Sequence, residues 1–284
     1  MKNLKLAFSS CPNDTFMFHA LVHGLVDTEG LAFDVDIYDV EELNERAQRG
    51  VYDVTKLSYH GWFTVHDDYA MLESGSALGY DCGPLLVCRS GPVISPQPGL
   101  RIAIPGTYTT GALLCRLAYP GLGTMVPMIF SRIEEAVSSG EADLGVLIHE
   151  GRFTYRDKGL ELVRGLGAWW QETSGCPIPL GGIAVRRSLG PEIAASVNRA
   201  LHRSISYAFA HPEASRAYVA SYARELSASI QQKHIDMFVN RFSLDLGAEG
   251  HRAVDTLYQC YERVNLHGGN QEALPDGRER SAGA

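Results

Sequence analysis

One histidine in this sequence lies where a general base would be useful. The segment "EADLGVLIHEGRFTY" (141–155) is an apolar run that ends at His149 and continues as a polar loop. Histidine exchanges protons near neutral pH, so His149 is a candidate general base, although a purely structural histidine is the alternative. The segment has neither the GxSxG motif of acyl transfer nor the HExxH motif of a zinc enzyme. A single general base is therefore the chemistry that it favours.

Two further segments carry groups that can bind a carboxylate. "TKLSY" ends a second apolar run with Lys56 and Ser58, and an ammonium beside a hydroxyl can hold a carboxylate through charge-assisted hydrogen bonds. "SSCPNDTFMF" places Asn13 and Asp14 at the start of a predicted helix, where free backbone N–H groups attract anions. Asp14 is the expected N-cap. The alternatives are an exposed Lys56, a Ser58 that bonds only to its own loop, and an Asn13–Asp14 pair that only caps the helix.

A third segment, "IPGTYTTGALL", predicts a strand, a glycine-containing loop and a helix. Thr109 and Thr110 fall at the start of that helix, so hydroxyls and backbone N–H groups converge there. The segment lacks both the GxxxxGK[ST] and the GxGxxG patterns, which argues against a nucleotide. It suits a carboxylate or a polyol better. A plain N-cap by Thr109 or Thr110 is the alternative.

The elements that must position these residues alternate between short apolar strands and helices, which predicts an α/β fold with largely parallel sheets. The predicted strands are 4–9, 33–38, 54–58, 85–89, 101–104, 125–130, 144–149 and 182–186. The predicted helices are 14–22, 40–48, 110–118, 131–138, 191–210, 212–225, 230–239 and 249–264.

A weak internal repeat links two of the candidate segments. Residues 43–59 and 133–149 each predict a helix, a C-terminal glycine (Gly50 and Gly140), an aspartate (Asp53 and Asp143) and an apolar strand. Ligands of parallel α/β sheets bind at the carboxyl ends of the strands. The repeat therefore places the Lys56 and His149 segments at two equivalent positions where a site is expected.

Proline-rich and glycine-rich stretches predict how the chain divides. "RSGPVISPQPG" is expected to leave one lobe, and "SGCPIPLGG" to return to it. We predict a discontinuous α/β domain 1 of residues 1–96 plus 178–284 and an inserted α/β domain 2 of residues 97–177. A cleft between the two is the expected place for a small ligand.

Composition narrows the class of protein. The 284 residues carry a formal net charge of -8, so a nucleic-acid partner or an anionic membrane surface is not expected. The sequence has no apolar stretch of roughly 18 residues and no secretory signal, and its six cysteines form no CxxC pair. We expect free thiols, no metal site and a cytoplasmic protein.

The segments quoted above, together with "LGAWWQETSGCPIPLGG", resemble in order the chorismate dehydratase and naphthoate synthase family of the futalosine route to menaquinone. "SCPNDTF" indicates the naphthoate-forming branch. The resemblance implies a two-lobed fold like that of periplasmic binding proteins. It also implies a lyase that cleaves cyclic dehypoxanthinylfutalosine to 1,4-dihydroxy-6-naphthoate and dihydroxyacetone.

The same resemblance implies roles for individual residues. It makes His149 the proton acceptor and places substrate contacts on Lys56, Leu57, Ser58, Thr109 and Thr110. It implies a small carboxylate substrate and requires no metal or other cofactor. The alternative is a non-enzymatic binding protein or sensor for a small carboxylate, which would share the fold. The sequence does not indicate an oligomeric state.

Overall fold

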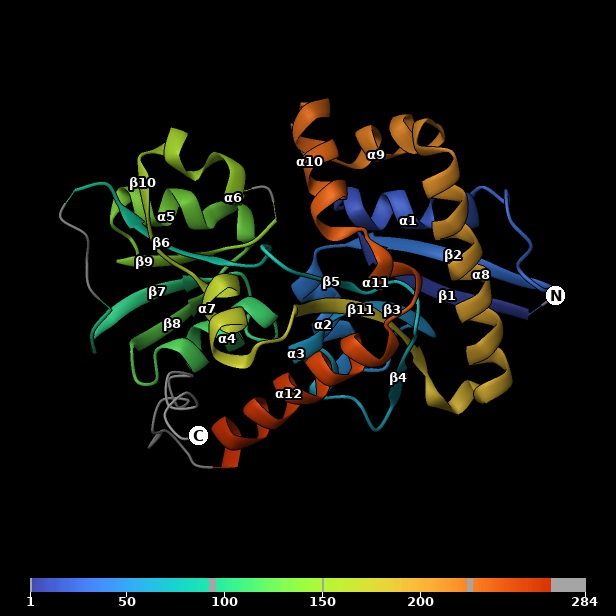
Figure 1. Ribbon diagram of the computed structural model, residues 1–284, viewed down its shortest axis with the longest axis horizontal. Helices are drawn as coiled ribbons and strands as arrows, with labels where there is room; N and C mark the ends of the chain where they lie inside the picture. Colours follow the sequence, from blue (N-terminus) through green and yellow to red (C-terminus); the bar gives the residue numbers. More distant parts are fainter. Residues whose placement is uncertain (1, 92–95, 150, 224–226, 267–284) are drawn as a thin grey trace, which may run out of the picture. The chain divides into compact units, whose positions relative to one another are not determined.

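The computed structural model describes residues 2–91, 96–149, 151–223 and 227–266, and it confirms the α/β prediction (Figure 1). The chain forms two compact units, each made of two chain segments. Unit 1 comprises residues 1–79 and 179–251, and unit 2 comprises residues 80–178 and 252–284.

Unit 1 contains a six-stranded mixed sheet in the order β2-β1-β3-β11-β4, with β5 paired to β11. The first three strands are parallel, and β11 runs antiparallel to β3 and β4. The strands are β1 (Lys2–Ser9), β2 (Leu31–Tyr38), β3 (Val54–Ser58), β4 (Tyr69–Met71), β5 (Ala77–Gly79) and β11 (Ile178–Arg186).

Helices cover both faces of this sheet because its strands bury side chains on both sides (Figure 1). Along β1, Leu4, Leu6 and Phe8 enter one core cluster, and Ala7 enters another. The first cluster lies under α1 (Pro12–Val22), α8 (Pro191–Ala210), α9 (Arg216–Tyr222) and α10 (Ala228–Phe238). The opposite face carries α2 (Val40–Gln48) and α3 (Tyr59–Phe63), and α11 (Arg241–Leu244) lies beside β5.

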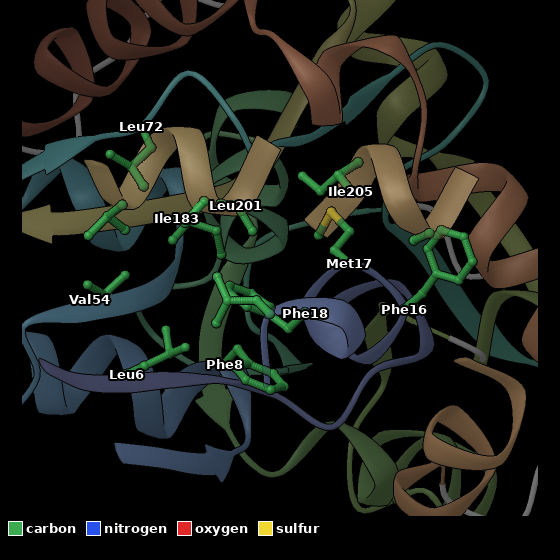
Figure 2. Close-up of a cluster of buried hydrophobic side chains, with 14 of the residues drawn as sticks. Leu6, Phe8, Phe16, Met17, Phe18, Val54, Leu72, Ile183, Leu201 and Ile205 are labelled. Carbon is green, nitrogen blue, oxygen red and sulfur yellow. The ribbon is translucent and has the colours of Figure 1, made fainter. Parts of the chain in front are cut away.

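A large core cluster of unit 1 lies where α1 packs on β1 and α8 (Figure 2). The rings of Phe8 and Phe18 are stacked with centroids 4.3 Å apart, and both side chains are fully buried. Ser204 of α8 joins the two helices, because its hydroxyl donates to the Met17 carbonyl at 2.6 Å and accepts from the Leu21 N–H at 3.0 Å. These contacts hold α1 at a fixed place over the sheet.

Unit 2 contains a five-stranded sheet in the order β10-β6-β9-β7-β8. Strands β7, β8 and β9 are parallel, and β6 runs antiparallel to β9 and β10. The strands are β6 (Leu85–Arg89), β7 (Leu100–Ile104), β8 (Gly123–Pro127), β9 (Leu144–Leu147) and β10 (Leu160–Gly165). The helices are α4 (Thr110–Ala118), α5 (Ile133–Ser139), α6 (Gly151–Thr154), α7 (Leu166–Ser174) and the part of α12 (Gly247–Leu266) from Arg252 onward. Short 3-10 helices lie in unit 2 at Phe130–Arg132 and Tyr155–Lys158, and in unit 1 at Arg187–Leu189 and Pro212–Ser215.

The internal repeat seen in the sequence has matching geometry in the two units. Asp53 accepts the Lys5 backbone N–H at 2.9 Å, and Asp143 accepts the Arg101 N–H at 2.7 Å. The strand registers that follow are equivalent, with Leu6 opposite Val54 in one unit and Ile102 opposite Leu144 in the other. Both repeat glycines adopt the predicted left-handed conformation, with φ of 61° at Gly50 and 82° at Gly140.

Several predicted boundaries are corrected by the structure. Strand β9 ends at Leu147, so His149 lies beyond it in a turn. Helix α1 begins at Pro12 with Cys11 as its N-cap, so Asp14 is not the N-cap. Proline suits this first helical position because its missing N–H has no partner there in any helix. The predicted helix 212–225 is a 3-10 turn followed by α9, and its last two residues, 224 and 225, lie outside the described part.

The division into units differs from the predicted domain limits. Residues 80–96, which we assigned to domain 1, belong to unit 2, because β6 is hydrogen-bonded between β9 and β10. The chain from Arg252 onward also belongs to unit 2 rather than to the first domain. Local patterns located β6 correctly but did not show which sheet it joins.

Truncating Leu6 to alanine should lower the free energy of unfolding by about 2–5 kcal/mol, because it leaves a cavity in the unit 1 core. Leu6 is 1% exposed, whereas Leu25 in the same unit is 45% exposed. The matched Leu25→Ala change should cost less than about 0.5 kcal/mol. Urea unfolding of both variants measures the difference, and equal costs would contradict this assignment of the core.

Acid should destabilise unit 1 through His19 of α1. Burial, followed by the neighbouring ring of His23 at 4.5 Å, lowers the pKa of His19 below 6.5, and the ring of Tyr218 lies 5.7 Å away. The unfolded chain then binds more protons, so stability is lost as pH falls below about 6.5. His19→Gln should lose less stability than wild type between pH 8 and pH 5.5. Urea unfolding at both pH values tests this, and parallel losses would rule it out.

Candidate functional site

The Asp14 carboxylate is the centre of a buried polar network in unit 1. Its Oδ2 accepts the Ser9 hydroxyl at 2.6 Å and the Ser9 N–H at 3.3 Å. Its Oδ1 accepts the Asn13 side-chain amide at 2.8 Å and lies 3.1 Å from Lys56 Nζ. The structure thus brings together three of the predicted site residues, namely Asn13, Asp14 and Lys56, at the carboxyl ends of β1 and β3.

Lys56 is a buried cation, 5% exposed, rather than a surface lysine. Strand alternation accounts for its direction, since Val54 two residues earlier enters the cluster under α1. The ammonium forms an ion pair with Asp14, yet it makes no hydrogen bond of good geometry to any residue in the described part of the chain. An ammonium has three N–H donors, so Lys56 retains donors for a ligand anion.

Ser58 and Leu57 occupy different environments. The Ser58 hydroxyl accepts from the Asn44 amide at 3.2 Å, and its N–H donates to Asn44 Oδ1 at 3.0 Å. The Leu57 side chain is fully buried among apolar residues of the opposite face, including Tyr69 and Ala184. Leu57 therefore offers a ligand only its backbone.

Asn13 receives a contact that our sequence analysis missed. His234 Nε2 of α10 lies 3.0 Å from Asn13 Oδ1, and His234 is 1% exposed. The sequence offers one indication of His234, because it lies next to Ile235 on the apolar side of a predicted helix. Its partner, 221 residues earlier in the chain, could not be read from that pattern.

Thr109 and Thr110 lie at the N-terminus of α4 in unit 2, as predicted. The Thr109 hydroxyl accepts from the Ala112 N–H at 3.3 Å and donates to the Gly106 carbonyl at 2.9 Å, which confirms Thr109 as the N-cap. Thr110 is the first residue of the helix and is 2% exposed. The aligned peptide dipoles of α4 give this first turn a partial positive charge.

The same helix end packs against the strand that leads to His149. A Cβ added at Gly111 would lie 3.3 Å from Ile148, Pro84 and Val146. Glycine at this position lets the α4 N-terminus approach the end of β9 closely. The Thr110–Gly111 turn and the Ile148–His149 turn are therefore neighbours in unit 2.

His149 itself has an unusual backbone. Its φ of 54° is left-handed, which costs a non-glycine residue of the order of 1 kcal/mol. Its ring meets the edge of Phe130 with centroids 4.9 Å apart. Beyond it, Arg152 donates to the Gly83 carbonyl at 3.0 Å, and burial lowers the pKa of this guanidinium. The loop that carries His149 is thus anchored to the chain before β6.

A cavity of about 390 Å³ lies in unit 2, along α4 and beside β8. Arg116, Tyr119 and Met125 line it with other, mainly apolar residues, and none of the predicted site residues is part of this lining.

Within the described ranges, no group of three or more His, Cys, Asp or Glu residues is placed to hold a metal ion. No helix in the same ranges is long and apolar enough to cross a membrane.

Two curated relatives are similar to most of the chain. A 1,4-dihydroxy-6-naphthoate synthase of Thermus thermophilus is 46% identical over 266 residues, which cover 94% of this chain and 96% of the relative. A protein of the same name from Streptomyces coelicolor is 42% identical over 256 residues, covering 88% and 90%.

Solved structures support the fold. A protein of Archaeoglobus fulgidus superposes with a TM-score of 0.87 at 37% identity, covering 93% of this chain and 98% of its own. A Candida albicans protein described as having the generic periplasmic binding protein fold superposes with a TM-score of 0.68 at 12% identity, covering 96% and 97%. That likeness shows the fold alone, and it confirms the predicted fold type.

A family model described as menaquinone biosynthesis matches residues 4–263. The chain therefore belongs to this menaquinone biosynthesis family.

Proposed function

We propose that the protein is a lyase that cleaves cyclic dehypoxanthinylfutalosine to 1,4-dihydroxy-6-naphthoate and dihydroxyacetone. The observation that carries this proposal is the name shared by the two relatives, at 46% and 42% identity over most of each chain. The residues that each unit carries agree with it, namely Lys56 in unit 1 and Thr109 and His149 in unit 2. A base, a helix N-terminus and a buried cation are the groups that such a cleavage needs.

His149 is the proposed proton acceptor. Release of a three-carbon fragment from a carbocycle breaks a carbon–carbon bond, and removal of a hydroxyl proton from the departing fragment initiates this step. The electrons of the broken bond pass into the ring system, where aromatisation drives the reaction. The α4 N-terminus, which packs beside the His149 turn, supplies N–H groups that stabilise developing negative charge on oxygen.

The carboxylate of the substrate is assigned to Lys56 and Ser58. Lys56 is buried, charged and retains N–H donors, which are the properties that favour a charge-assisted hydrogen bond to a carboxylate. Asn13 and Asp14 hold the ammonium in place, and Leu57 contributes through its backbone. Thr109 and Thr110 are the proposed contacts to the polar part of the substrate. No step in this proposal requires a metal or an organic cofactor.

We also propose that the protein works in the cytoplasm. All six cysteines are free thiols buried in the structure, as is usual for a protein in a reducing compartment. Cell fractionation of the producing organism, with an antibody against the protein, tests this location.

His149→Asn should lower kcat by about 10²–10⁴-fold, because it removes the base but keeps a residue that tolerates left-handed backbone. The assay separates the naphthoate and dihydroxyacetone by chromatography with mass detection. His202→Ala, which removes an exposed histidine of α8, is the matched control and should retain full activity.

The same assay distinguishes the proposed enzyme from a binding protein. If wild type retains the substrate tightly but releases no product, the protein is a carboxylate-binding protein rather than a lyase. If His149→Asn forms product at the wild-type rate, the lyase assignment stands and His149 is not its base.

Lys56→Met should raise the KM for the substrate by about 10- to 100-fold, the effect of losing one charge-assisted hydrogen bond of 1.5–3 kcal/mol. It also leaves the buried Asp14 carboxylate without its cation, which is destabilising. The double variant Asp14→Asn/Lys56→Met removes both charges and should recover thermal stability without recovering KM. Recovery of both would show that Lys56 serves only the fold.

A further inference from the structure

The orientation of the Asn13 amide is determined by its two neighbours. Asp14 is a carboxylate beside an ammonium and can only accept hydrogen bonds. The Asn13 group that faces it at 2.8 Å is therefore the NH₂ group, which leaves Oδ1 facing His234. An amide oxygen only accepts, so the His234 ring nitrogen 3.0 Å away must be the donor. The network thus assigns the proton of His234 to Nε2.

These contacts form one directed chain of hydrogen bonds inside unit 1. His234 donates to Asn13, and Asn13 donates to Asp14, which is paired with Lys56. Each of these side chains is at most 6% exposed, so water does not readily replace a missing partner. The ring of His234 is held against Phe238, with centroids 4.7 Å apart, within the same helix α10.

We propose that His234 is a positioning residue for the carboxylate subsite at Lys56, an inference that rests on the proposed function. It acts through Asn13 and does not touch the substrate. By fixing the Asn13 amide, it keeps an N–H donor on Asp14 Oδ1, the same oxygen that faces the ammonium. That donor disperses the negative charge of Asp14 and leaves the Lys56 ammonium free to bind a second carboxylate.

Loss of the His234 donor has a defined consequence. Asn13 Oδ1 would lose its buried partner, and a flipped amide would instead place this oxygen against the Asp14 carboxylate. Asp14 would then compete more strongly for Lys56, and the ammonium would move toward it. Affinity for a carboxylate substrate should fall, whereas the chemical step at His149 should be little changed.

The experiment compares His234→Leu with His234→Gln, because the Nε2 group of glutamine can replace the imidazole Nε2–H as donor. His234→Leu should raise the KM for cyclic dehypoxanthinylfutalosine about tenfold and change kcat less than threefold, whereas His234→Gln should stay within about twofold of wild type. In an Asn13→Leu background, His234→Leu should raise KM no further, since the residue through which it acts is already gone. A merely structural histidine would impose its penalty in both backgrounds.

A second readout does not depend on activity. Nitrogen-15 NMR of histidine-labelled protein should show His234 protonated at Nε2 and not at Nδ1 alone, with its signal identified by loss in His234→Gln. A proton on Nδ1 alone overturns the proposal. Normal turnover with an unchanged KM in His234→Leu also overturns it but leaves the proposed function intact. Absence of turnover in wild type instead contradicts the proposed function.

Discussion

In each unit an aspartate carboxylate accepts the backbone N–H of a neighbouring strand, and this interaction sets the register on which the candidate site depends. Asp53 binds Lys5 in unit 1, and Asp143 binds Arg101 in unit 2. A shift of one residue in either pairing would turn every side chain of the strand to the other face. Lys56 would then point away from Asp14. The hydrogen bonds of Asp53 and Asp143, made where β3 and β9 begin, thus determine the positions of the polar residues where these strands end.

Equivalent scaffolds support different chemistry in the two units. Asn13 follows Lys5 at the same sequence separation at which Thr109 follows Arg101, and Lys5 and Arg101 are the residues bound by the two aspartates. Asn13 and Thr109 each lie at the start of a helix. In unit 1 the first turn of this helix carries a carboxylate, that of Asp14, which accepts from the N–H and hydroxyl of Ser9 and is paired with Lys56. In unit 2 it carries threonines, which leave the positive end of α4 uncompensated by an acid in its first turn. The first arrangement suits a permanent carboxylate, and the second suits charge that develops during a reaction.

Many helices and strands could be predicted from the sequence because the residues that determine them lie within the segments themselves. Helices such as α2, α4 and α8 have the predicted limits, since their caps and apolar periodicity lie within the segments themselves. Strand β10 was missed because its charged residues, Glu161 and Arg164, are three positions apart and break the alternation typical of a strand, and only pairing with β6 makes it a strand. The assignment of β6 to unit 2 and the contact from His234 to Asn13 both depend on partners distant in the chain. The left-handed φ of His149 was equally hidden, because no glycine marks it.

The buried Asp14–Lys56 pair raises a physical question about binding an anion. A closed ion pair is neutral, so a ligand carboxylate gains little from Lys56 unless Asp14 is stabilised by other donors. Asp14 has three of these: the hydroxyl and the N–H of Ser9, and the Asn13 amide. Its position in the first turn of α1 adds the favourable field of the helix N-terminus. Because Ser9, Asn13 and the helix N-terminus already stabilise the Asp14 carboxylate, Asp14 holds the Lys56 ammonium in place without occupying the N–H donors of that ammonium. The absence of a well-directed hydrogen bond between the two side chains indicates this. The pair therefore functions as a positioned cation, and its cost of desolvation is offset by the network around Asp14 rather than by the ion pair alone.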